Sequence, residues 1–102
     1  DFEKQTYFEQ QLNKIINLCN SRQVKVILYT SPVWKTYSDQ MKKEQWRKTQ
    51  EIINNILEKH QNIEYHSFLE VDTLGQGDFR DGDHLNAIGA EKFSKMLNNL
   101  ID

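Results

Sequence analysis

Residues 79–90 read FRDGDHLNAIGA, and they place an acid–histidine pair directly before a helix. Asp81 and His84 are three residues apart, and Gly82 between them allows the backbone to fold tightly. A carboxylate oxygen of Asp81 can then reach one ring nitrogen of His84, which leaves the other nitrogen free to take a proton. The stretch therefore predicts a carboxylate–imidazole pair on a turn.

The residues after this turn predict a terminal helix. Asn86 is a natural N-cap, because its side-chain oxygen can accept a hydrogen bond from the first helical turn. Gly89 stands early in this helix at a cost of about 1 kcal/mol relative to alanine, so we expect a close packing contact or a close backbone approach there. The apolar face of the helix is formed by Phe93, Met96, Leu97, Leu100 and Ile101.

Two further helices and two strands are predicted before a loop rich in helix breakers at residues 75–78. Apolar residues recur at helical spacing near the N-terminus, which predicts a helix over about residues 2–20. Residues 24–30 form a nearly continuous, β-branched apolar run, typical of a central parallel strand buried on both faces. A long helix follows from about residue 41 to 60, and alternation over residues 63–69 predicts a second, shorter strand.

The order helix, strand, helix, strand, helix predicts an α/β fold, with parallel strands joined by right-handed crossovers. The chain would contribute a partial parallel sheet with flanking helices. Two parallel strands make an unlikely independent sheet, because parallel sheets normally have several strands and both faces covered. We therefore expect strands upstream in the sequence, or a second copy of the chain, to complete the sheet.

The composition of the 102 residues excludes some classes of partner and membrane segment. Thirteen basic and fifteen acidic residues give a formal net charge of −2, so no charge excess favours nucleic acid. No span approaches the roughly 18 apolar residues of a transmembrane helix. The single cysteine, Cys19, excludes an internal disulfide, and its place in an amphipathic pattern favours a buried apolar role over a reactive thiol.

Residues 81–94 resemble the last motif block of the SGNH (GDSL-type) serine hydrolases, an aspartate, two residues, a histidine, then Leu-Asn and a glycine. More weakly, residues 25–32 resemble the strand that follows the asparagine block of that family. The resemblance implies a three-layer, flavodoxin-like SGNH-hydrolase fold. It also implies that residues 1–102 are the C-terminal part of a single α/β domain.

The same resemblance implies a Ser-His-Asp triad with no cofactor. In such a triad Asp81 would orient the ring and His84 would act as general base. The chain has no Gly-Asp-Ser block, so the nucleophilic serine and the oxyanion-hole residues are expected upstream. We expect the complete protein to be a serine esterase or acyltransferase, and this chain alone to be inactive.

The acidic residues around His84 leave alternatives open. Asp83 is the sequence neighbour of His84 and could take the carboxylate role, although it falls on a variable position of the family pattern. Asp72 and Asp78 add to the acidic cluster, but the spacing fits neither an EF-hand loop nor a metalloprotease helix, so no metal site is expected. In a purely structural reading, Asp81 caps a helix entrance and His84 packs.

Ser31, Trp34 and Tyr37 follow the first strand and are candidates for a substrate groove. Ligands of open α/β sheets bind beyond the carboxyl ends of the strands, which is where these residues would lie. Ser31 lacks a glycine-rich elbow, so we do not expect it to be the nucleophile. The alternative role of the two aromatic residues is to cover the core, or surface that further strands would protect.

Partners and location follow from the resemblance alone. It implies an acylated small molecule or carbohydrate ester as substrate, and an extracytoplasmic location. The competing hypothesis is a non-catalytic α/β module that acts through self-association or protein binding, because unpaired strand edges invite a partner chain. A Gly-Asp-Ser segment upstream would favour the enzyme, whereas an obligate homo-oligomer would favour the module.

Overall fold

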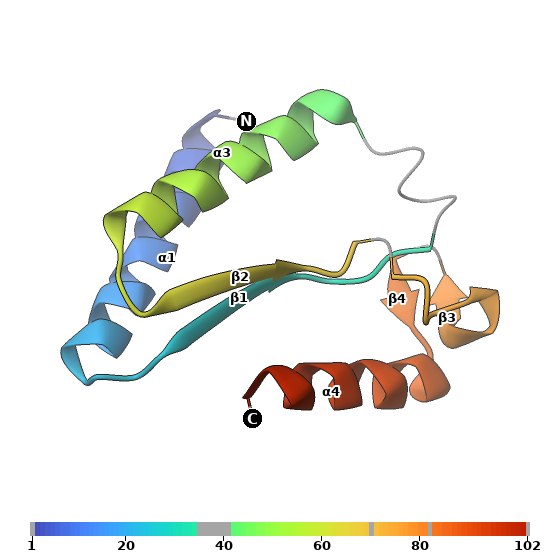
Figure 1. The fold of residues 1–102 in the computed structure, drawn as a ribbon. Coiled ribbons are helices and arrows are strands. Elements are labelled where there is room, and N and C mark those ends of the chain that lie inside the picture. The colour runs from blue at the N-terminus through green and yellow to red at the C-terminus, as the bar shows by residue number, and fades with distance from the viewer. Residues whose placement is uncertain (1, 35–41, 70, 82, 102) are drawn as a thin grey trace. The chain divides into compact units, whose positions relative to one another are not determined.

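The computed structural model describes residues 2–34, 42–69, 71–81 and 83–101 (Figure 1). The chain divides into two compact units. Unit 1 comprises Asp1–Leu28 and Lys42–His66, and unit 2 comprises Tyr29–Met41 and Ser67–Asp102. Each unit has buried side chains of its own.

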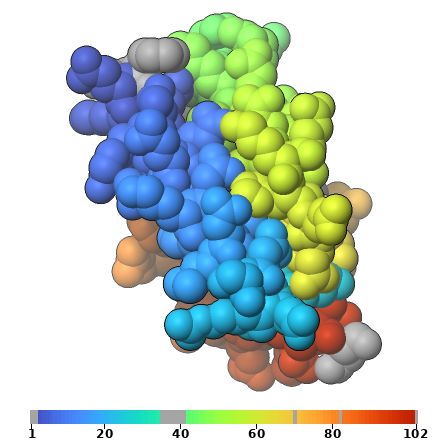
Figure 2. Space-filling model, turned by 90° about the vertical axis from the view of Figure 1, so that its left-hand side faces the viewer, coloured from blue at the N-terminus to red at the C-terminus, as the bar shows by residue number. Residues whose placement is uncertain are grey.

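Most of unit 1 consists of two helices, α1 (Phe2–Ser21) and α3 (Lys43–Lys59). They lie side by side (Figure 2), and each buries one isoleucine completely, Ile16 in α1 and Ile56 in α3, both at 0% exposure. The ring Nε2 of His60, the C-cap residue of α3, lies 2.5 Å from Oδ1 of Asn13 in α1. The pair of helices therefore combines an apolar core with a polar contact.

Both helices lie where the apolar periodicity of the sequence predicts them. The predicted end of α3 near Lys59 is also confirmed, since the backbone N–H of His60 donates to the Ile56 carbonyl at 3.2 Å. Lys59 lies in the last turn, where a cation favours the negative end of the helix dipole. Arg47 makes ion pairs with Glu44 and Glu51 on the exposed face of the same helix.

The strands β1 (Val26–Thr30) and β2 (Ile63–Ser67) form a two-stranded parallel sheet. Val26 N–H donates to the Asn62 carbonyl at 3.1 Å, and Phe68 N–H donates to the Thr30 carbonyl at 3.0 Å. Both strands are shorter than the predicted spans. Tyr29 is 46% exposed and the rest of β1 is half-buried, because β1 has only β2 as a neighbour among the described residues. Within that part of the chain, β1 is therefore not the fully buried central strand that its apolar run predicts.

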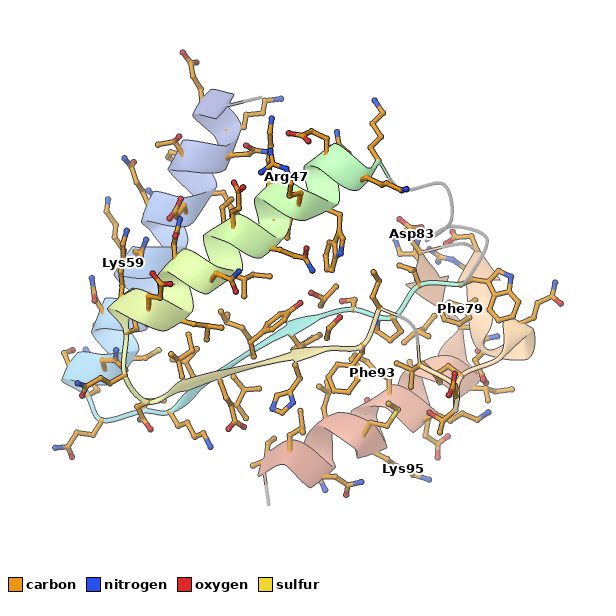
Figure 3. All side chains as sticks on the ribbon, turned by 45° about the horizontal axis from the view of Figure 1, so that its top comes forward. Arg47, Lys59, Phe79, Asp83, Phe93 and Lys95 are labelled. Carbon is orange, nitrogen blue, oxygen red and sulfur yellow. The ribbon has the colours of Figure 1, made fainter. Side chains whose placement is uncertain are left out.

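Unit 2 has an aromatic core. Phe93 projects from α4 (Ala87–Ile101) and is 8% exposed (Figure 3). Its ring centroid lies 5.1 Å from that of Phe68 and 5.6 Å from that of Tyr29, both in edge-to-face geometry. Such pairs add to the free energy gained from burial, because the positive ring edge meets the negative ring face. Phe93 thereby fixes α4 to the residues at the ends of β1 and β2.

Taken together, helices and short strands make this a small α/β chain, as predicted at that level. None of the helices in the described ranges is long and apolar enough to cross a membrane.

Candidate active site

The acid–histidine segment is a short β-ribbon rather than a simple turn. The strands β3 (Phe79–Asp81) and β4 (His84–Leu85) pair in antiparallel fashion, with Phe79 opposite Leu85 and Asp81 opposite His84. An irregularity of the register lies between Phe79 and Asp81. Gly82, on which the predicted tight turn depended, lies outside the described residues. The pairing places the two site residues across from each other at one end of the ribbon.

Asp81 and His84 are in hydrogen-bonding contact. Nδ1 of His84 lies 2.8 Å from Oδ1 of Asp81, which confirms that the two side chains meet. An ionised carboxylate can only accept, so in the neutral ring Nδ1 carries the proton and Nε2 holds the free lone pair. The His84 side chain is 56% exposed, so more than half of its surface is open to solvent.

Asp83 also approaches the ring. Its Oδ1 lies 2.9 Å from Nδ1 of His84, almost as close as Oδ1 of Asp81. The backbone N–H of Asp83 donates to Oδ1 of Asp81 at 3.2 Å, so Asp81 is itself held by the segment between the strands. Asp81 has the additional advantage of lying directly opposite His84 in the strand pairing. The geometry therefore favours Asp81 as the orienting acid, with Asp83 as a second negative charge.

The charge of Asp81 is stabilised by its neighbours. The hydrogen bond from His84 lowers the pKa of the Asp81 carboxyl below its ordinary value, and the backbone N–H of Asp83 lowers it further. The guanidinium of Arg80 lies 3.9 Å from Oδ2. Asp81 is therefore a carboxylate throughout the neutral pH range, which is the form needed to hold a protonated ring.

The first turn of α4 is capped as predicted. Oδ1 of Asn86 accepts from the backbone N–H of Gly89 at 2.9 Å, and Nδ2 of Asn86 donates to the Gly77 carbonyl at 2.6 Å. Gly77 belongs to a short 3-10 helix, η1 (Gln76–Asp78). Asn86 therefore joins the start of α4 to η1.

Gly89 is required by a close backbone contact. A Cβ atom at this position would lie 2.0 Å from the backbone oxygen of Asp78, far inside van der Waals contact. The close approach predicted from the sequence is thus confirmed, and the surface approached is η1.

Asp78, which the sequence singles out only as part of an acidic cluster, has a structural role beside the ribbon. Its carboxylate is buried, accepts from the Gly75 backbone N–H at 2.9 Å, and lies 3.0 Å from Nζ of Lys92. The backbone hydrogen bond from Gly75 lowers the pKa of Asp78, and the Lys92 ammonium lowers it further. Asp78 and Lys92 are fourteen residues apart, so no local pattern signals their contact.

Of the proposed groove residues, Trp34 contacts the ribbon. Its ring centroid lies 6.0 Å from that of Phe79, and its side chain is half-buried. Ser31 is exposed in the segment after β1, and Tyr37 lies outside the described residues. The structure therefore brings one of the three candidates to the strand that carries Asp81.

The ligating atoms of Asp81, Asp83 and His84 lie within 4.8 Å of one another, and all three residues are exposed. A cation held by both carboxylates beside Nδ1 of His84 would replace the Nδ1 proton on which the hydrogen bond to Asp81 depends. The wider acidic cluster does not include Asp78 as a free ligand, because its carboxylate is bound by Lys92 and Gly75.

Unit 1 has a separate hollow of about 470 Å³, which contains no acid–base pair like that of the ribbon. Amide side chains dominate its lining. Oδ1 of Asn20, one of these residues, is buried and has no hydrogen-bond partner within the described part of the chain. The lining residues are Asn17, Asn20, Gln23, Lys59, His60, Gln61 and Asn62. The ribbon is therefore the better candidate for a catalytic site.

Comparison with known proteins identifies a family but assigns it no function. No curated protein and no solved structure matches the chain. A protein-family model matches residues 2–102, which is nearly its whole length. The chain therefore belongs to this family, whose function is unknown.

Proposed function

We propose that the chain is the C-terminal part of an SGNH-type serine esterase or acyltransferase. In this proposal Asp81 orients the ring, His84 is the general base, and the nucleophilic serine comes from a segment upstream of these residues. The observation that carries the proposal is the 2.8 Å contact between Nδ1 of His84 and Asp81, on a ring that remains 56% exposed. That combination leaves Nε2 free to receive a proton.

The proposed reaction has two acyl-transfer steps. In the first, Nε2 of His84 takes the serine proton while the serine oxygen bonds to the acyl carbon, and Nε2 then returns the proton to the departing alcohol oxygen. In the second, water or another hydroxyl attacks the acyl-serine with the same proton transfers, and the serine is released. Asp81 stays ionised throughout and stabilises the imidazolium that forms in each step.

The proposed fold is the three-layer, flavodoxin-like arrangement in which further parallel strands extend the sheet. The two-stranded sheet formed by β1 and β2 supports this extension, because parallel sheets normally contain more strands. The exposed side chain of Tyr29 on β1 is the kind of surface that such an addition would cover.

The proposed substrate is an ester of a small molecule or a carbohydrate. Trp34, in the segment after β1, pairs with Phe79 on the strand that carries Asp81, and an apolar acyl chain or the apolar face of a sugar ring can pack against such rings. This contact supports Trp34 as a substrate-binding residue, because Phe79 lies on the same strand as Asp81.

The proposal is tested by acyl-enzyme formation on an activated acetyl ester. We expect the complete protein to release a stoichiometric burst of the leaving alcohol, because acylation of the serine precedes its slower hydrolysis. His84→Ala should abolish the burst, whereas His66→Ala, at a histidine of β2, should retain it. The 102-residue chain alone should give no burst.

Two results would count against the proposal. A complete protein that neither hydrolyses nor transfers an acyl group would exclude the enzyme. A burst from the 102-residue chain alone, lost in His84→Ala, would show that the nucleophile lies within these residues.

The second candidate is a non-catalytic module that self-associates. It is favoured by an apolar strip on the exposed side of α1, whose four members are 55–65% exposed: Tyr7, Phe8, Ile15 and Leu18. Four apolar residues at these spacings lie on one side of a helix, and such strips commonly mark interaction surfaces.

Sedimentation equilibrium distinguishes the two candidates. For the module, the chain should be a dimer or larger at micromolar concentration, and Ile15→Glu should dissociate it, because a buried, unpaired charge opposes association. The matched change Lys14→Glu, at an exposed polar position of the same helix, should have little effect. A monomer at all concentrations, together with the acyl burst of the complete protein, would leave only the enzyme.

A further inference from the structure

The Asp81–His84 pair is not held by burial. The side chains of Asp81 and His84 are 50% and 56% exposed, and exposed charge pairs contribute little to holding their own geometry. The pair must therefore be held by the backbone of the ribbon. Because β3 and β4 are only three and two residues long, they depend on what fixes their other end.

That other end is closed by the backbone of Asp78. Asp78 immediately precedes β3, and Asn86 immediately follows β4. The backbone N–H of Asn86 donates to the Asp78 carbonyl at 2.9 Å, so one hydrogen bond joins the start of one strand to the end of the other.

The side chain of Asp78 holds this residue in place as well, through two further hydrogen bonds. Its Oδ2 accepts from the Gly75 N–H at 2.9 Å and from Nζ of Lys92 at 3.1 Å. Gly75 precedes η1 and Lys92 lies in the second turn of α4, so the carboxylate ties a loop and a helix to the base of the ribbon. Removing a buried carboxylate leaves both donors without this acceptor.

Helix α4 adds a steric contact to these bonds. The backbone of Gly89 approaches the Asp78 carbonyl so closely that no larger residue fits. Asn86 bonds at once to Gly77 and Gly89, and so clamps η1 against the first turn of α4. One end of the ribbon is therefore held by the contacts of Asp78. The other end is exposed and carries Asp81 and His84.

We propose that Asp78 is a positioning residue, which sets the geometry of the Asp81–His84 pair through the β3–β4 ribbon. The effect of Asp78 on catalysis rests on the proposed esterase function, whereas its effect on the geometry of Asp81 and His84 does not. Asp78 touches neither His84 nor a reacting atom in this proposal. It acts by keeping the two strands in the register that places Asp81 opposite His84.

The test is ¹⁵N NMR of the histidine rings in the complete protein, with His84 assigned by the loss of its signals in His84→Ala. In the unaltered protein we expect the neutral ring of His84 to be protonated at Nδ1, because Asp81 accepts from that atom. Asp78→Ala should lower the population of this tautomer by roughly half, and Lys92→Met by about half as much. Lys95→Met is the matched control, since Lys95 pairs only with the exposed Glu91 among the described residues, at 3.5 Å (Figure 3).

The same variants give a kinetic readout if the complete protein is an esterase. Asp78→Ala should lower kcat by about 10²-fold with little change in KM, because a displaced base slows proton transfer without removing substrate contacts. Lys95→Met should leave both parameters unchanged.

The outcomes separate the two proposals. If the tautomer of His84 is unchanged in both Asp78→Ala and Lys92→Met, the positioning role is wrong, whatever the activity. If Asp78→Ala does not fold, Lys92→Met alone decides. If the tautomer responds and the complete protein has no acyl-transfer activity, the positioning role stands and the esterase function fails.

Discussion

If the complete protein is the proposed esterase, Asp81→Asn should lower its kcat for ester hydrolysis about 10⁴-fold, with KM nearly unchanged. The carboxylate accepts a hydrogen bond from Nδ1 of His84, whereas the amide of asparagine can present an N–H to the same atom. A ring that accepts at Nδ1 carries its proton on Nε2 and cannot receive the serine proton. Steady-state kinetics on an activated acetyl ester measure the loss.

Asp83→Asn is the matched control for this change. Asp83 lies almost as close to Nδ1 of His84 as Asp81 does, at 2.9 Å against 2.8 Å, but it does not lie opposite His84 in the strand pairing. We expect a loss of less than about tenfold, which is the size of a weakened through-space charge effect. The reverse ranking, with Asp83→Asn the more damaging variant, would transfer the orienting role to Asp83.

Gly89→Ala should lower the free energy of unfolding by about 2–3 kcal/mol. The added methyl carbon would lie 2.0 Å from the Asp78 carbonyl oxygen, so α4 and η1 must separate. The better helix propensity of alanine offsets only about 1 kcal/mol of this loss. Urea unfolding followed by circular dichroism measures the change as a lower midpoint at constant slope.

Gly75→Ala serves as the comparison, because nothing lies within 4 Å of a Cβ atom at this position. The φ of Gly75 is −112°, which alanine adopts without strain, and its N–H still reaches Asp78. We expect no loss of stability, or a gain of about 0.4–1 kcal/mol from the lower entropy of the unfolded chain. Equal destabilisation by both substitutions would mean that the contact with Asp78 is not what requires Gly89.

The three long helices could be predicted from the sequence because each carries its own signal. Apolar periodicity over fifteen or more residues defines α1, α3 and α4, and Asn86 marks the start of the last. The contact between Asp81 and His84 was also predicted, because a tight turn between two residues only three positions apart brings their side chains within hydrogen-bonding distance. Gly89 was informative for a related reason, since glycine is unfavourable in a helix unless a contact requires it.

The remaining features depend on contacts between distant residues. The strands β3 and β4 are too short to show an alternating pattern, so the ribbon read as a turn. Trp34 contacts Phe79, and Asp78 contacts Lys92. The residues of each pair are far apart in the sequence, so no local pattern predicts these contacts. The apolar run of β1 predicted complete burial, but burial is a property of the whole sheet, and only β2 lies beside β1 in the described residues.

The ribbon also bears on which part of the proposed site would persist without a nucleophile. Asp81 and His84 lie within four consecutive positions. Among the described residues, the hydrogen bonds that hold the Asp78 end of the ribbon come from residues 75–92. If the proposed function is correct, loss of the serine from the complete protein would leave these bonds in place, because none of them involves that serine. A variant without the serine should therefore retain the ribbon and its contact between Asp81 and His84.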